Sequence, residues 1–325
     1  VLGRVQFTLL ENEAAGKMIR RILLEWAKHE VDLNWDLTTY HDLNGEAHYQ
    51  LGLTMIIYVL AWDAIRLEDF VSPQDRKTID DYLHGLMTFL TQMLAREEGH
   101  VFENEFDCPY PCEFGVEVFN HAWTQDLSLM AYGVLTRNDT LYQRGIRRFF
   151  AVLDGIVRPD GSHYSDSQRG GSALSYSIGS TDTLIRFAEL AASQGHDLYG
   201  VEIEGKSLHT IMEYHVSVLE DETLMHPYSQ SVLELAFYCE DQACTDNWNN
   251  LFWSEENYHG FYRDSGWIEF DVYRKRFPGS PLVERYLSEI PGLEVYACLL
   301  YTSPSPRDEQ FHLVCRLLLE KRGGG

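Results

Sequence analysis

Residues 119–134 read FNHAWTQDLSLMAYGV, and apolar side chains recur in this stretch at every third or fourth position. Phe119, Trp123, Leu127, Met130 and Val134 would therefore share one face of a helix, because an α-helix turns once in about 3.6 residues. Several positions between them are polar, such as Gln125, Asp126 and Ser128. The stretch predicts an amphipathic helix that packs one face against a core.

The same spacing returns along most of the chain, and strand-like alternation is scarce. Short breaks rich in Gly, Asp, Asn and Pro separate the helical stretches. Many helices joined by short loops favour an all-α fold of antiparallel helical hairpins, which close into an (α/α) toroid or stay open as an incomplete toroid or solenoid. The further helical stretches are expected near 11–29, 50–66, 79–93, 149–157, 172–194, 208–219 and 228–240.

One domain is predicted over 1–297, because no linker-like shift in composition precedes residue 298. Residues 298–308, CLLYTSPSPRD, resemble a translated sequencing-adaptor read-through, and the chain ends in three glycines. We interpret 298–325 as a non-native tail; a genuine disordered or loosely docked tail is the alternative.

The formal net charge is −24, which argues against a nucleic-acid partner because such proteins need a basic surface. It also counts against a polyanionic substrate unless cationic side chains gather locally in a cleft. No apolar run reaches the ~18 residues that span a bilayer, so no membrane partner is expected. The chain has no initiator Met and no signal-peptide pattern, so its N-terminus is expected to be processed, trimmed or incomplete.

Two cysteine pairs, Cys108 with Cys112 and Cys239 with Cys244, are spaced to close short disulfide loops. Disulfides persist in oxidising compartments, so a secreted or periplasmic location is expected, with cytosolic free thiols as the alternative. Paired metal-binding knuckles, His-Glu metal spacings, Gly-rich phosphate loops and nucleophile elbows are absent from the sequence, so no metal and no cofactor is expected.

Four residues offer the groups needed to remove a proton beside a carboxylate: Asn120, His121, Arg169 and Tyr176. β-Elimination at a uronic acid removes the C5 proton and expels the 4-O-linked sugar. The amide of Asn120 and the guanidinium of Arg169 would neutralise the C6 carboxylate. Tyr176 would act as base and then as acid, since nearby positive charge from Arg169 and His121 lowers the pKa of a phenol.

Each of these residues also has a structural explanation. Asn120 can bond a helix backbone, His121 can be an ordinary core or surface histidine, and Tyr176 is one of 19 tyrosines. Trp123 fits the apolar stripe, which favours core packing over stacking on a sugar. The functional interpretation rests on the ordered set and not on any single member.

The segment Asn120–Gly200 resembles the alginate lyase superfamily, in particular the mannuronate-lyase group with its incomplete (α/α) toroid. The similar motifs are Asn120-His121 with Trp123, the turn Pro159-Asp160-Gly161, Arg169 seven residues before Tyr176, and the run GHDLY at 195–199. Weaker likeness covers 26–65 and 267–286, where the run YRKRF at 273–277 is similar to the last toroid helix. The chain departs from the family at Phe119, often a second Asn, and at 170–172, often a denser basic run.

The resemblance implies a polysaccharide lyase that cleaves a 1,4-linked uronate polymer, alginate (polymannuronate) being the first choice, and leaves 4,5-unsaturated ends. Its catalytic residues would be Tyr176, His121, Asn120 and Arg169. The substrate-binding candidates are Trp123, Arg276 and the pair His48 and Tyr49, which are expected on a loop over the cleft.

Two other functions remain open on the sequence. Glu103, Glu105 and Asp107 precede Cys108 and offer paired carboxylates for a glycoside hydrolase on a helical toroid. A protein that binds carbohydrate without catalysis is the other alternative. Saturated product ends would indicate the hydrolase, and saturable binding without turnover would indicate the binding protein.

Overall fold

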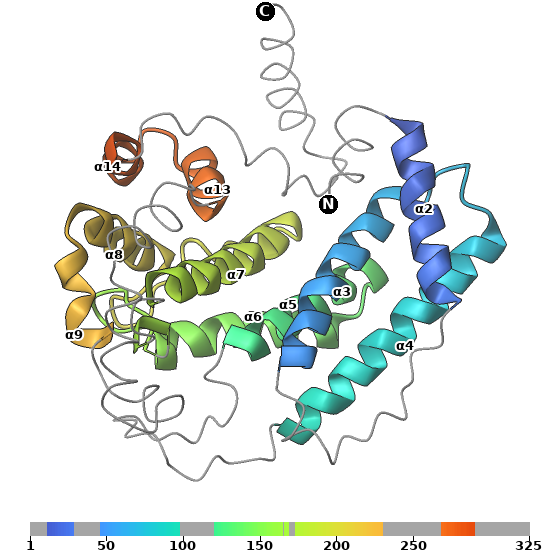
Figure 1. Cartoon of the computed structure of the whole chain (residues 1–325), viewed down its shortest axis with the longest axis horizontal. Helices are drawn as coiled ribbons and strands as arrows, with labels where there is room; N and C mark the ends of the chain where they lie inside the picture. The colour runs from blue at the N-terminus through green and yellow to red at the C-terminus, as the bar shows by residue number, and fades with distance from the viewer. Residues whose placement is uncertain are drawn as a thin grey trace, which may run out of the picture. The chain divides into compact units, whose positions relative to one another are not determined.

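The computed structural model describes residues 12–28, 46–97, 120–164, 166–168, 173–229 and 268–289. These ranges are dominated by helices (Figure 1). Their only β-type pairing consists of two isolated bridges, Val157 with His163 and Ile203 with Lys206. The all-α class predicted from helical periodicity is therefore confirmed over the described part of the chain.

The described residues form two compact units. The first takes its residues from 12–28, 46–97 and 124–145, and the second from 120–123, 146–229 with its gaps, and 268–289. The predicted single domain over 1–297 stays a prediction. The tail 298–325 and both cysteine pairs lie outside the described residues.

In the first unit, α2 (Glu13–Ala27), α3 (Glu46–Ile65) and α4 (Pro73–Glu97) pack pairwise against one another (Figure 1). Helix α2 begins where Asn12 Oδ1 accepts a hydrogen bond from the Ala15 amide at 3.2 Å, which satisfies one amide of the first turn. It buries Ile19 and Leu23, which lie one turn apart. The Nε1 of the fully buried Trp62 donates to Asp80 Oδ1 at 2.7 Å and so joins α3 to α4.

Helix α5 (Asn120–Thr136) and helix α6 (Asp139–Ala151) form a hairpin across residues 137–138. A Cβ at Gly145 would lie 2.6 Å from the Met130 side chain, so a glycine lets the two helices approach closely. Near that contact the buried Asp126 carboxylate is paired with the Arg144 guanidinium. The helix predicted from the stripe at 119–134 is present, but the prediction that it packs through one face is wrong, because residues 122–133 are buried on every side.

The second unit is organised around α7 (Ala173–Ser193), which packs against α8 (Leu208–Glu220), α13 (Ile268–Arg276) and the 3₁₀ turn η4 (Asp166–Gln168). Helix α14 (Pro281–Glu289) packs against α8 and α13. The short elements η6 (Glu222–Leu224) and α9 (His226–Ser229) follow α8, and α9 lies against η4. The rings of Phe187 and Phe270 are completely buried in this unit.

Helix α6 ends in a single π-helical turn, η3 (Val152–Ile156). The Val157 amide donates to the Val152 carbonyl five residues earlier, at 3.0 Å. The carbonyl of Asp154 accepts from Lys206 Nζ at 2.5 Å. Such turns are rare and are often found beside functional sites; here the π turn leads directly into the turn at 158–168.

No helix within the described ranges is long and apolar enough to cross a membrane. In the same ranges no group of three or more His, Cys, Asp or Glu side chains is placed to hold a metal ion.

Candidate active site

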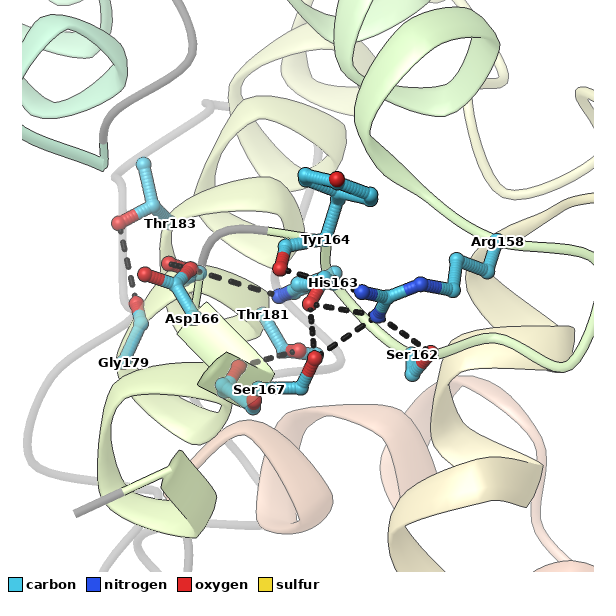
Figure 2. Close-up of polar contacts among 11 residues, drawn as sticks. Arg158, Ser162, His163, Tyr164, Asp166, Ser167, Gly179, Thr181 and Thr183 are labelled. Atoms are coloured by element: carbon cyan, nitrogen blue, oxygen red, sulfur yellow. Dashed lines mark hydrogen bonds and ion pairs between the residues drawn. The ribbon is translucent and has the colours of Figure 1, made fainter. Parts of the chain in front are cut away.

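The turn from Arg158 to Gln168 belongs to the second unit and lies between π turn η3 and helix α7 in the chain. Figure 2 shows its polar contacts. The Arg158 amide donates to the Ser162 carbonyl at 2.8 Å and closes the tight turn that Pro159, Asp160 and Gly161 predict. Gly161 has φ +93°, and a Cβ there would lie 2.2 Å from the Thr210 carbonyl oxygen of α8. A glycine is therefore required at this position.

The guanidinium of Arg158 crosslinks the whole turn (Figure 2). Its Nη1 donates to Ser162 Oγ at 3.0 Å, to Ser167 Oγ at 2.8 Å and to the His163 carbonyl at 3.2 Å. Its Nη2 donates to the Tyr164 carbonyl at 3.3 Å. One cation thus binds oxygens from four residues, and that fixes the backbone path that leads to η4.

Two tyrosine rings also contact the Arg158 guanidinium. Its carbon lies 4.6 Å from the Tyr164 ring centroid and 4.1 Å from that of Tyr228, both within the range of cation–π attraction. Tyr228, on α9, donates its hydroxyl to Asp160 Oδ2 at 2.5 Å. Burial lowers the pKa of Arg158 from its usual value, but a guanidinium remains charged at neutral pH.

His163 lies under this turn and is completely buried. Its ring meets the edge of Trp123 at 5.8 Å and that of His215 at 6.1 Å between centroids. Burial lowers the pKa of His163 well below its usual range, and the neighbouring His215 and Arg158 lower it further. Asp166 Oδ2 lies 3.8 Å from His163 Nδ1, too far for a hydrogen bond, so burial dominates and the ring is neutral at pH 7.

Asp166, the first residue of η4, is also completely buried. Its Oδ2 accepts a hydrogen bond from the hydroxyl of Ser180, a fully buried residue of α7. This contact fixes the end of the 158–168 turn to the helix that carries Tyr176.

Tyr176 lies in the first turn of α7 and is 37% exposed, whereas Leu174 and Ser177 on either side of it are completely buried. Its phenol is therefore presented at the surface of a helix whose neighbouring positions pack inward. A surface-presented phenol at the start of this helix is what an acid/base role for Tyr176 requires.

Of the other three catalytic candidates, Asn120 and His121 are placed by their backbone. Asn120 and His121 are the first two residues of α5, and Arg169 directly follows η4 in the chain. The side chains of Asn120 and His121, and all of Arg169, lie outside the described residues, so their distances from Tyr176 stay predictions. The backbone segments are nevertheless connected. The Trp123–His163 contact joins the start of α5 to the turn, and the Asp166–Ser180 bond joins the turn to α7.

The substrate-binding candidates fare differently. Trp123 is completely buried, so the structure supports core packing and corrects the interpretation of its ring as a sugar-stacking surface. His48 and Tyr49 belong to the first turn of α3 and not to a loop, because helix α3 begins at Glu46; their side chains lie outside the described residues. Arg276 binds Glu189 through two bonds of 2.8 Å, which joins α13 to α7; a substrate role for it stays a prediction.

Sequence reasoning missed the buried polar residues behind the site. The burial of Arg158, His163, Asp166 and Ser180 was not predicted, because polar residues are mostly exposed and nothing in their sequence neighbourhood marked these four as exceptions. The one available hint was the spacing of Asp166 three residues before Arg169, in a segment already selected for its basic residue and its tyrosine.

Comparison with known proteins gives the same class of protein as the fold and the order of the candidate residues along the chain. The family model described as alginate lyase matches residues 62–224, about half of the chain. The chain belongs to the alginate lyase family.

Individual relatives agree with this assignment. A polysaccharide lyase from Stenotrophomonas maltophilia (strain K279a) is 30% identical over 135 residues, which is 42% of this chain and 35% of that protein. The chain thus spans about a third of the length of the curated relative it matches.

Solved structures show the same fold. Alginate lyase A1-III in complex with a tetrasaccharide superposes with a TM-score of 0.57 at 20% identity, over 71% of this chain and 58% of that one. Alginate lyase A1-III from Sphingomonas species A1 gives a TM-score of 0.56 at 16% identity, over 87% and 69%. The (α/α) toroid class expected from the sequence is confirmed by this likeness.

Proposed function

We propose that this chain is a polysaccharide lyase that cleaves a 1,4-linked uronate polymer by β-elimination, with alginate as the first substrate to test. One observation carries the proposal. The start of α5, the 158–168 turn and the start of α7 are connected by the Trp123–His163 contact and the Asp166–Ser180 bond, and the four candidate residues belong to these segments or adjoin them in the sequence. Membership of the alginate lyase family supports it.

The reaction needs the C6 carboxylate neutralised before its α-carbon becomes acidic. Asn120 donates a hydrogen bond to that carboxylate, and Arg169 adds a two-point cationic contact. One lost donor of this kind commonly costs about 3 kcal/mol of transition-state stabilisation. The anion that forms at C5 is thereby spread onto the carboxylate oxygens.

Tyr176 removes the C5 proton and His121 supports its ionised form, since a nearby positive charge favours a phenolate. The electron pair left at C5 forms the C4–C5 double bond as the bond from C4 to the linking oxygen breaks. The phenol, or the imidazole, returns a proton to that oxygen. The product carries a 4,5-unsaturated non-reducing end, and no cofactor takes part.

The test is incubation of the purified chain with alginate, glucuronan and a glycosaminoglycan while the absorbance of the unsaturated product is followed. A rise with one of the three supports the proposal and names the substrate. Products with saturated ends indicate the hydrolase, and binding without turnover indicates a non-catalytic carbohydrate-binding protein.

We also propose that the protein works in a secreted or periplasmic compartment, on the basis of the pairs Cys108–Cys112 and Cys239–Cys244. Intact-mass measurement before and after reduction and alkylation checks this. Loss of two hydrogens per pair in the unreduced protein supports disulfides, whereas full alkylation without reduction contradicts them.

A further inference from the structure

We propose that Asp166 and Ser180 are positioning residues for the lyase reaction, and that their hydrogen bond holds the first turns of α7, which carry Tyr176, in a fixed position against the 158–168 turn. The inference rests on the proposed function of Tyr176. Neither Asp166 nor Ser180 is expected to touch the substrate, because both side chains are completely buried.

The first support is the rigidity of the turn. The Arg158 guanidinium donates to four oxygens of the turn. The Ser167 amide also donates to the His163 carbonyl at 3.1 Å, and the Tyr164 amide donates to the Ile156 carbonyl at 2.8 Å. These bonds leave the backbone little freedom. The described residues of the turn therefore move together, and a contact that fixes η4 also fixes the turn before it.

The second support is the place of the bond on α7. Ser180 follows Tyr176 by four residues, so the two lie on one side of the helix a single turn apart. Asp166 precedes Arg169 by three residues. The Asp166–Ser180 bond thus ties the 158–168 turn to the turn of α7 that follows Tyr176.

The third support is chemical. A carboxylate buried in the interior weakens a fold unless it is well bonded, and an apolar residue of similar size would usually stabilise the same site as well or better. A hydroxyl-to-carboxylate bond is short and directional, so it holds two groups at a defined separation. We therefore infer that Asp166 serves to hold the turn and α7 at a defined separation, and not simply to fill the core.

The experiment compares Ser180→Ala with the matched control Thr181→Val. Thr181 is the next residue, equally buried, and its hydroxyl donates only within α7, to the Ser177 carbonyl at 2.8 Å. Both variants lose one buried hydroxyl. Only Ser180→Ala loses the bond to the turn.

For Ser180→Ala we expect kcat on the uronate polymer to fall about 10- to 100-fold with KM within about twofold, because a small misplacement of reacting groups costs turnover more than binding. Thr181→Val is expected to keep kcat within about twofold. Asp166→Asn keeps an amide oxygen that accepts the Ser180 proton and is expected to retain most of kcat, whereas Asp166→Ala is expected to match Ser180→Ala.

Amide hydrogen exchange of residues 163–168 tests the same bond without activity. Exchange in this segment is expected to be at least about tenfold faster in Ser180→Ala than in Thr181→Val, since loss of the bond lets the turn open locally. A kcat for Ser180→Ala equal to that of Thr181→Val would overturn the positioning role while the lyase proposal stands. Equal exchange rates in the two variants would show that the Asp166–Ser180 bond does not hold the turn. This result can be obtained even if the wild-type protein shows no turnover.

Discussion

His163 and His215 meet edge to face in the interior of the second unit, with ring centroids 6.1 Å apart and no exposed surface on either side chain. Burial lowers the pKa of His215 to about 3. Burial, with His215 and Arg158 adding to it, lowers the pKa of His163 well below its usual range. Both rings are therefore neutral in the folded protein at pH 7.

The free energy of unfolding is accordingly expected to fall as the pH drops below about 6.5. Each unfolded histidine then binds a proton that the folded one does not, which costs about 1.4 kcal/mol per pH unit for each ring. For His215 the loss continues down to about pH 3. Urea unfolding of the wild type at pH 7.5, 6 and 5 measures the slope.

A variant that lacks one of the buried rings tests this prediction. His215→Leu should give a shallower pH dependence than wild type, because it has no imidazole to bind a proton on unfolding. A His215→Leu slope equal to that of wild type would show that His215 charges freely in the folded state.

Tyr176→Phe should lower kcat by roughly 10²–10⁴ because the ionisable oxygen is lost, and the melting temperature should stay close to that of the wild type because the ring keeps its packing. Steady-state turnover with calorimetry measures both quantities. Tyr82→Phe, on a half-exposed tyrosine of α4, is the matched control and should retain full activity. Near wild-type turnover in Tyr176→Phe would leave this phenol with a packing role only.

Arg169→Ala should lower kcat/KM by about 10²-fold or more, since the C6 carboxylate loses its counter-charge. Arg169→Lys should restore only part of it, because an ammonium cannot reproduce the two-point contact of a guanidinium. The ratio of kcat/KM between the two variants is the measurement. Equal activity of the Ala and Lys variants would remove Arg169 from the carboxylate site.

Gly161→Ala should lower the free energy of unfolding by about 2–5 kcal/mol, through an unfavourable positive φ and a clash with the Thr210 carbonyl. Gly85→Ala makes the opposite prediction: a Cβ there meets no atom within 4 Å inside helix α4, so stability should rise by about 0.5–1 kcal/mol. Urea midpoints of the two variants compare them directly. A stable Gly161→Ala would mean that the turn and α8 can separate at little cost.

Added salt should lower KM for a uronate polymer, by about threefold or more between 20 and 200 mM NaCl, because screening weakens the repulsion between a chain of net charge −24 and a polyanion. Initial rates over a range of polymer concentrations give KM at each salt level. A KM that rises with salt would show instead that local cations in the cleft outweigh the overall charge.

Much of the fold was readable from apolar spacing. The stretch expected at 172–194 is α7 (Ala173–Ser193), and the one expected at 50–66 is α3 (Glu46–Ile65). Periodicity works here because burial of one helix face leaves a direct trace in the order of apolar residues. The π turn at Val152–Ile156 was not foreseen, since a change of hydrogen-bond partner by one residue leaves the apolar stripe almost intact.

The site was predictable only in part. The position of Tyr176 at the start of a helix followed from the sequence, but the burial of Asp166 and its bond to Ser180 did not. That bond depends on how η4 packs against α7. Such a tertiary contact cannot be predicted from the residues that are adjacent in the sequence. For Trp123 the sequence pattern was informative. Its place in the apolar stripe predicted the burial that the structure shows, whereas the family resemblance suggested that its ring contacts the substrate.

The π turn at the end of α6 also bears on how this chain is aligned with its relatives. A bond from Val157 to Val152 encloses one residue more than an α-helical bond would. A homologue whose corresponding helix is α-helical throughout should therefore be one residue shorter between 151 and 157. Alignments that place no gap there would shift Arg158 and every residue of the following turn by one position.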